Sequence, residues 1–463
     1  MVHDLKNLSA VETLQGLHNK EFSAVDYATD LVGRIEANTH LNTIQCFDAD
    51  LLLDNAQKAD NKRAAGIAGS LCGLPFIAKD NINSTSFPTT GGTGALIGHT
   101  PELDADVIIS LQEAGAILAG KANMHELALG ITSNNTITGA VHNPHGRNLI
   151  PGGSSGGTAA AVAAEIFPVG LGTDTGGSCR IPAALCGVVG FRPTTGRYSS
   201  AGIMPISHTR DTVGPLARTV ADIALLDAVL SRKPRAISNS PMANITLGIP
   251  KDVLYENLEP QVKQAIDAQL QVLEASGVRL IEVDMTSIWS HNEAFGFPVV
   301  LYELMRDLPA YIAQHVPHIS FDDLITGIGS PDVAGLLGSQ LGSEAMPLAA
   351  YRAAMDTHRP AMRQIYAQTF AKHQLNAIVM PTTPLTARKI GEDETIGLNG
   401  QLLPTFTTYI RNTDLASNLG APGISLPCQN ISGLPVGIEL DGLPGQDDQL
   451  LAVASTIEAI LKL

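Results

Sequence analysis

The sequence predicts an α/β protein in which a mixed, mostly parallel twisted central sheet is sandwiched between helices. Short apolar segments that suit buried strands alternate along the chain with amphipathic segments that suit helices. The composition, 44% hydrophobic and 16% charged, is typical of a globular chain with a large core. We see no internal repeats or low-complexity tracts, so one layered body is the simplest interpretation.

Helical periodicity opens the chain. Apolar residues recur at helical spacing at Leu8, Val11, Leu14 and Leu17. Capping-box patterns precede this helix and the next one, formed by Ser9 with Glu12 and by Ser23 with Asp26.

The later elements follow the same alternation. We expect strands at 73–79, 116–120, 169–173, 245–249, 278–284, 377–380, 424–427 and 435–440. We expect helices at 104–114, 259–276 and 447–461. The polar, proline-containing stretch 231–244 is interpreted as a surface excursion, so residues 1–463 are expected to form a single domain with a catalytic core at about 70–200.

Charge and cysteine content exclude several classes of function. A formal net charge of -16 argues against a nucleic-acid binder or a protein of acidic membrane surfaces, because both need clustered Lys and Arg. No window resembles a membrane span, and the first residues do not resemble a secretory signal. Five scattered cysteines without metal-binding spacing indicate a reduced cytoplasmic protein with no metal site. The acidic charge is compatible with a homodimer.

Two glycine-rich runs each contain a candidate nucleophile. Residues 151–157 read PGGSSGG around Ser154, and residues 172–180 read GTDTGGSCR around Ser178. A hydrolytic serine needs a tight turn whose backbone N–H groups point at the oxyanion formed during attack. Gly176 and Gly177, directly before Ser178, allow such a turn.

Two other interpretations of the first run are weaker. Gly152, Ser154 and Gly156 match the G-x-S-x-G elbow of α/β-hydrolases, but the preceding residues read as a loop and not as the required strand. An anion cradle at a helix N-terminus would also suit the glycines, but no Walker lysine follows them.

Lys79 stands at the end of the apolar segment GLPFIAK. A lysine at a strand end often extends its ammonium group to solvent. A desolvated lysine, by contrast, is neutral nearer to physiological pH and can act as a base in place of histidine.

Together the three pieces resemble the amidase signature family. The match consists of Lys79 in GLPFIAKDN, Ser154 in PGGSSGG and Ser178 in GTDTGGSCRIPA, and it extends from about residue 8 to the C-terminus. The resemblance implies the amidase signature fold and a catalytic triad in which Ser178 is the acyl nucleophile, Ser154 relays a proton and Lys79 is the base. It also implies a cis Gly153–Ser154 peptide.

The resemblance assigns further roles around the triad. Backbone amides of Thr175, Gly176, Gly177 and Ser178 would form the oxyanion hole. Ser155, Asp174 and Arg180 match family positions that support the loop. An acyl-enzyme and ammonia or an amine would form, with no cofactor and no metal.

A closer resemblance is to the bacterial indole-3-acetamide and mandelamide hydrolases of that family. It rests on NMHELALGITSNN at 123–135, CGVVGFRPTTGRY at 186–198, FPVVLYE at 297–303, SPDVA at 330–334 and RNTDLASNLGAPGISLP at 411–427. These segments imply an amidohydrolase acting on a small-molecule arylacetamide such as indole-3-acetamide. Met124, Phe297 and Tyr302 are candidates for the apolar pocket that such a substrate needs, beside ordinary core roles.

Three rival functions would use the same framework. One is a broader amidase, esterase or carbamate hydrolase, and another is the glutaminase subunit of a tRNA-dependent amidotransferase. His125 in NMHELALG replaces an acidic residue that we associate with that subunit, which disfavours it. An inactive scaffold is disfavoured because Lys79, Ser154 and Ser178 are all present.

Overall fold

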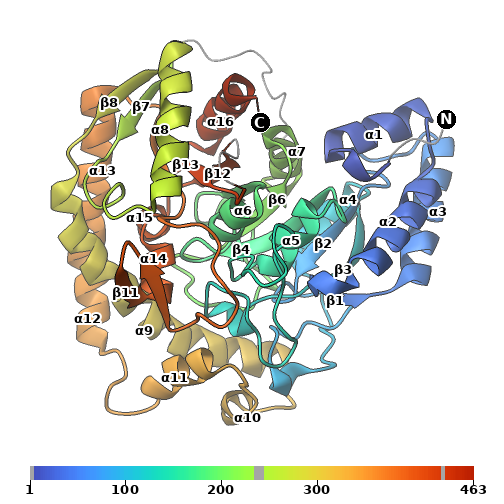
Figure 1. The fold of residues 1–463 in the computed structure, drawn as a ribbon. Coiled ribbons are helices and arrows are strands. Elements are labelled where there is room, and N and C mark those ends of the chain that lie inside the picture. The colour runs from blue at the N-terminus through green and yellow to red at the C-terminus, as the bar shows by residue number, and fades with distance from the viewer. Residues whose placement is uncertain (1–4, 234–243, 429–432, 463) are drawn as a thin grey trace.

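A mixed sheet runs through the computed structural model, which describes residues 5–233, 244–428 and 433–462. Its eleven strands among these described residues lie in the spatial order β1 (Ile44–Phe47), β3 (Ile117–Ala122), β2 (Pro75–Lys79), β4 (Val169–Asp174), β6 (Thr212–Ala217), β5 (Val189–Arg192), β12 (Gly423–Pro427), β13 (Gly437–Asp441), β9 (Ala377–Pro381), β7 (Thr246–Ile249) and β8 (Arg279–Glu282). Figure 1 shows β1 and β3 toward the side of the molecule where α2 (Ala24–Ala37) and α3 (Ala49–Ala64) lie, and β7 and β8 toward the opposite side.

The parallel strand pairs form two blocks. β3, β2 and β4 run parallel to one another, as do β8, β7 and β9. Between the blocks, neighbouring strands from β4 to β9 pair antiparallel, and β1 adds an antiparallel edge. The α/β class and the mixed sheet between helices are therefore confirmed. Within the described residues the parallel character expected from the sequence is concentrated in these two blocks.

Helices cover both faces of the sheet. One face packs against α1 (Ala10–Asn19), α4 (Asp106–Glu113), α7 (Val220–Leu230), α8 (Pro260–Ala275) and α16 (Asp447–Leu461). The other face packs against α2 (Ala24–Ala37), α3 (Ala49–Ala64), α5 (Gly156–Ala163), α6 (Arg180–Cys186), α13 (Arg359–His373) and α15 (Asp414–Leu419).

Neighbouring residues of a buried strand serve these two layers in turn. In β2, Phe76 and Ala78 pack with the first helix layer and Ile77 with the second. In β9, Val379 and Ile378 divide in the same way. Because both sides of these strands are buried, their sequences are continuous apolar runs, and such runs can be recognised in the sequence as strands.

The remaining elements lie around this sandwich. Among them are α9 (Trp289–His315), α10 (Phe321–Thr326), α11 (Pro331–Ser339), α12 (Leu348–Ala353), α14 (Thr405–Ile410) and a hairpin of β10 (Thr395–Leu398) and β11 (Gln401–Pro404). Single turns of 3-10 or π helix occur at Leu5–Asn7, Thr39–Leu41, Gly94–Leu96, Glu126–Ala128, Thr286–Ile288 and Ala354–His358. Figure 1 shows α10 and α11 on the side of the molecule away from α16.

The expected strands and helices are confirmed with boundaries shifted by at most a few residues. Both capping boxes are present, since Ser9 accepts from the Glu12 N–H and Ser23 from the Asp26 N–H, with the reciprocal bonds also formed. Several elements were left unassigned by the sequence patterns, among them the helices α3, α6, α7, α9 and α13 and the strands β1, β5 and β6. Residues 234–243 of the expected surface excursion lie outside the described residues.

The membrane and thiol expectations can be compared with the structure directly. Within the described ranges, no helix combines the length and the apolar character needed to cross a membrane. All five cysteines are free thiols, and Cys72, Cys179, Cys186 and Cys428 are buried.

A pair of glycine substitutions tests how tightly α5 is packed. An added Cβ on Gly157 would lie 2.2 Å from the Asn123 carbonyl oxygen and 2.7 Å from that of Thr43, and neither backbone atom can move freely. Gly157→Ala should therefore lower stability by about 1–3 kcal/mol. Gly33→Ala is the control, because a Cβ there meets nothing within 4 Å and should stabilise α2 by about 0.5–1 kcal/mol. Urea unfolding measures both, and equal shifts would contradict the packing argument.

Candidate active site

Lys79 ends β2 in the interior of the molecule. Its side chain is fully buried. The Lys79 Nζ atom lies 2.7 Å from Ser154 Oγ and 2.9 Å from Thr173 Oγ1. The Thr173 hydroxyl also accepts a hydrogen bond from Asn81 Nδ2 at 3.0 Å. The amine is therefore held between one serine and one threonine, and the solvent-directed alternative for Lys79 is wrong.

Burial determines the protonation of Lys79. Desolvation lowers the pKa of the amine to about 7, against the weaker opposing charges of Cys179, Asp174 and Asp211. No carboxylate of the described residues forms an ion pair with Lys79. A large fraction of the amine is consequently neutral at physiological pH and carries a lone pair beside Ser154.

The two serines come from adjoining loops. The Gly153–Ser154 peptide is cis, as expected. Ser154 is fully buried, whereas 8% of Ser178 is exposed. The Ser155 N–H donates to the Ser178 carbonyl at 3.2 Å, which joins the loops. Within the described ranges, Ser154 and Ser178 share no side-chain hydrogen bond, so Lys79–Ser154 is the half of the expected relay that is formed.

The segment at 123–135 supports the Ser154 loop. The His125 N–H donates to the Ser154 carbonyl at 3.1 Å. The Ser133 hydroxyl donates to the Gly152 carbonyl at 2.9 Å and accepts from the Gly156 N–H at 3.2 Å. The sequence marked this segment by its resemblance alone, and Ser133 had no local signal.

The N–H groups of the turn around Ser178 differ in whether they have an acceptor. The Gly177 N–H donates inward to Asp174 Oδ1 at 2.9 Å, and the Cys179 N–H donates to Oδ2 at 3.1 Å. Gly177 has a φ of 135°, a conformation that glycine adopts without strain. The amides of Thr175, Gly176 and Ser178 have no acceptor in the described part of the protein. The turn therefore presents free donors next to a serine, as an oxyanion site requires.

Asp174 connects this turn to two buried arginine side chains. Arg180 reaches its carboxylate at 3.0 and 3.1 Å, and Arg192 reaches it at 3.0 Å. Burial by itself raises the pKa of Asp174, but the two guanidinium groups outweigh it and hold that pKa well below its usual range. Arg180 also forms an ion pair with Glu439 of β13 at 2.5 Å. Asp174 and Arg180 were predicted as loop support, and these contacts are consistent with that expectation.

Arg210 and Asp211 also contact the turn, although no local pattern in the sequence marks either residue. Asp211 accepts a 2.6 Å hydrogen bond from the Thr175 hydroxyl, and burial raises the pKa of its carboxyl to about 6. Arg210 donates to the Thr175 carbonyl at 3.2 Å and forms an ion pair with Asp414.

A cavity of about 150 Å³ adjoins the Lys79 side of the turn. Its polar wall includes Asn81, Thr173, Thr175 and Asp211, and Asn81 Oδ1 is buried without a hydrogen-bond partner among the described residues. A wider groove of about 440 Å³ shares the wall formed by Ser200, Ile203 and Pro205.

The three predicted pocket residues lie in different surroundings. Met124 is buried in an apolar cluster with Leu127 and Met204. Tyr302 stacks on Tyr351, with ring centroids 4.4 Å apart. Phe297 is 49% exposed.

No histidine of the described residues hydrogen-bonds to the hydroxyl of Ser154 or Ser178, and the residues before Ser154 form a loop. The α/β-hydrolase alternative is therefore wrong.

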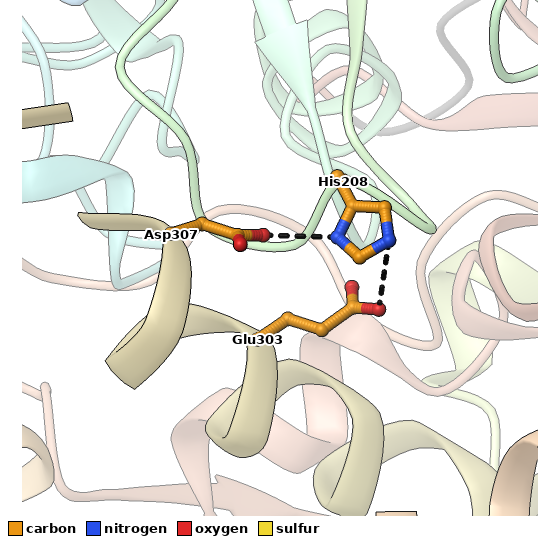
Figure 2. Close-up of side chains that lie close together, drawn as sticks. All are labelled: His208, Glu303 and Asp307. Carbon is orange, nitrogen blue, oxygen red and sulfur yellow. Dashed lines mark hydrogen bonds and ion pairs between the residues drawn. The ribbon is translucent and has the colours of Figure 1, made fainter. Parts of the chain in front are cut away.

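One histidine with two acidic neighbours raises the question of a metal, and that histidine, His208, also lines the cavity beside Thr175. In Figure 2, His208 lies between two carboxylates, with Nδ1 2.9 Å from Asp307 and Nε2 3.4 Å from Glu303. Because the two ring nitrogens face different carboxylates, one ion cannot sit in line with a ring nitrogen and both acids. Glu303 also already accepts from Ser207 and Thr209. The arrangement does not fit a metal centre.

The fold and the site define an amide-hydrolysing enzyme, and comparison with known proteins gives its family. The family model described as "Amidase" matches residues 27–451, so the chain belongs to the amidase family. An indoleacetamide hydrolase of Rhizobium radiobacter is 43% identical over 97% of this chain and 96% of its own length. A mandelamide hydrolase of Pseudomonas putida is 42% identical over 93% of this chain and 87% of its own.

Solved structures agree on the fold. A crystal structure of an amidase superposes with a TM-score of 0.88 at 33% identity and covers 98% of this chain and 100% of its own. Native peptide amidase from Stenotrophomonas maltophilia gives a TM-score of 0.85 at 28% identity, over 98% and 97% of the two chains. The expected amidase signature fold is thereby confirmed.

Removing the charge of Asp174 should unfold the turn. Asp174→Asn leaves Arg180 and Arg192 without their shared carboxylate, and breaking a buried ion pair in this way costs about 3–5 kcal/mol. Asp54→Asn is the matched control, because the Asp54–Lys58 pair is 61% exposed at both side chains and should change stability by less than about 1 kcal/mol. Chemical unfolding measures both variants, and similar small losses would show that Asp174 is not the anchor.

Proposed function

We propose that Lys79, Ser154 and Ser178 hydrolyse carboxamides through an acyl-enzyme on Ser178. The observation that carries the proposal is the 2.7 Å contact between Ser154 and a buried lysine whose pKa is lowered to about 7. A neutral amine there can accept a proton at physiological pH, and the neighbouring serine can relay it. No other buried lysine of the described residues contacts a serine, since Lys121 contacts the Ile82 and Pro88 carbonyls and Thr89.

The reaction then proceeds in two steps. Ser178 Oγ attacks the amide carbon while its proton passes to Ser154, whose own proton passes to Lys79. The carbon–nitrogen bond breaks as the proton returns to the leaving nitrogen, which departs as ammonia. Water attacks the ester by the same route in reverse and releases the carboxylic acid and Ser178.

We infer the donors of the oxyanion hole from which amides of the turn lack an acceptor among the described residues. We propose the N–H groups of Thr175, Gly176 and Ser178 as the donors. Gly177, which belongs to the predicted set, contributes through its φ of 135° and its inward bond to Asp174. That bond fixes the turn before the substrate arrives, so the donors need little reorganisation.

We propose arylacetamides as the substrate class, with indole-3-acetamide as the leading candidate. Support comes from two relatives named indoleacetamide hydrolase and mandelamide hydrolase, at 43% and 42% identity. We further propose that the chain acts as one amidase domain, since a single sheet joins the site to both ends of the described chain. The five free thiols suit a reducing cytoplasm.

A substrate panel tests this function. Purified protein alone should release ammonia from indole-3-acetamide, phenylacetamide and mandelamide and leave glutamine intact. Ser178→Ala should reduce turnover by at least about 10³-fold while the melting curve is unchanged, because the nucleophile is lost and the fold is not. Substantial residual activity in that variant would refute the nucleophile. Turnover of glutamine alone, or only with a partner protein, would favour the amidotransferase subunit instead.

The pH profile tests Lys79. Because the neutral amine is the active form and its pKa is about 7, kcat/KM should fall about tenfold per pH unit below that value and level off above it. Lys79→Ala should be inactive at neutral pH and recover in part at high pH, where hydroxide replaces the base. Lys58→Ala, at an exposed lysine, is the control and should retain the parent profile. A Lys79→Ala profile of the same shape as the parent's would exclude Lys79 as the base.

A further inference from the structure

We propose that Phe297 of α9 and Phe406 of α14 bind the aromatic ring of the substrate's acyl group, and that this pair sets the preference for arylacetamides. The inference rests on the proposed function, because it assigns a location to the ring of that substrate class.

The pair is an incompletely buried aromatic surface. The two ring centroids lie 6.4 Å apart with the ring planes inclined at 47°, within the usual range for interacting aromatic rings. Phe297 is 49% exposed and Phe406 is half-buried. A flat apolar ligand that covers these rings removes apolar surface from water, which favours binding.

The α14 side of the pair leads directly to the catalytic turn. Phe406 and Ile410 are four residues apart on α14 and therefore neighbours on one face of that helix. The Ile410 Cδ1 atom lies only 2.4 Å from the place that a Cβ on Gly176 would occupy, so Ile410 packs against the glycine itself. A continuous apolar path thus runs from Gly176 through Ile410 to Phe406.

The α9 side is fixed to the same turn by Arg210. The carbonyl of Gly296, next to Phe297, accepts a 3.3 Å hydrogen bond from Arg210, which also donates to the Thr175 carbonyl at 3.2 Å. An added Cβ on Gly296 would approach Asp414 Oδ2 to 3.2 Å, so α9 packs closely here. Phe406 is therefore linked to Gly176 through Ile410, and Phe297 is linked to Thr175 through Gly296 and Arg210.

The chemistry of this surface selects uncharged aromatic groups. Phe297, Phe406 and Ile410 offer no hydrogen-bond donor or acceptor in their side chains. The nearby charges of Arg210 and Asp414 are paired with each other, so they do not attract a free carboxylate or ammonium group. A phenyl or indolyl ring on a one-carbon arm suits such a surface, whereas the charged end of glutamine does not.

Matched substrates isolate the contribution of the ring. Phenylacetamide and propionamide share the amide and an adjacent CH2 group, but only the former carries an aromatic ring. In Phe297→Ala and Phe406→Leu we expect kcat/KM for phenylacetamide to fall about tenfold, mainly through KM, because aromatic contact and burial are lost. For propionamide the change should stay within about twofold. Leu402→Ala is the control, since Leu402 is 72% exposed on the preceding hairpin and should affect neither substrate.

Each outcome bears on the proposal. Equal losses for both substrates would indicate a merely structural role and overturn it. Unchanged phenylacetamide kinetics in both variants would overturn the proposal but leave the proposed function intact. The ring would then bind elsewhere, and the cavity beside Thr175 is the next location to test. A parent enzyme active on propionamide but not on phenylacetamide would overturn both the ring site and the arylacetamide assignment. Folding of each variant is checked by its melting curve.

Discussion

The buried carboxylate of Asp174 holds the catalytic turn in place and joins the two halves of the chain. It accepts hydrogen bonds from the backbone N–H groups of Gly177 and Cys179. It also forms ion pairs with Arg180 and Arg192. Arg180 extends the network to Glu439 and Ser417, far away in the sequence. Losing any of these donors would leave a buried charge less well compensated, so the network restrains the conformation of the turn. Preorganised donors are what an oxyanion site needs.

The same network acts on Lys79, the proposed base, through the charge of Asp174. Asp174 raises the pKa of Lys79 by its charge, and an unpaired carboxylate nearby would fix the lysine as an ammonium ion. Burial is the larger influence and lowers the pKa of Lys79 to about 7, while Arg180 and Arg192 hold Asp174 in its charged form. The threonine at 173 completes the arrangement, since it contacts the amine without adding charge.

Local sequence patterns predicted the elements that depend mainly on neighbouring residues in the chain. Buried strands such as 75–79 and 169–174 show as apolar runs, the helix caps at Ser9 and Ser23 show as short motifs, and the glycine runs mark both serine turns. Helix α9 was missed because Pro298 and Pro309 inside it read as breaks. Arg210, Asp211 and Thr173 contact the site through tertiary pairing, which leaves no periodic signal in a single sequence. The direction of the Gly177 N–H was likewise inaccessible, because it depends on where Asp174 lies.

The connections between the catalytic turn and the helices around it explain how one framework can serve different amides. Arg210 donates hydrogen bonds to the Thr175 and Gly296 carbonyls. The Thr413 hydroxyl donates to the Gly176 carbonyl at 2.5 Å. These acceptors are backbone atoms, which every residue type supplies. Side chains at positions such as 297 and 406 can therefore differ without disturbing the turn or the Asp174 network. The peptide amidase structure, which shares the fold at a TM-score of 0.85 with 28% identity, shows that the fold tolerates many side-chain differences. Under the proposals made above, buried charge constrains the turn that carries the chemistry, and half-exposed side chains on α9 and α14 carry the selectivity.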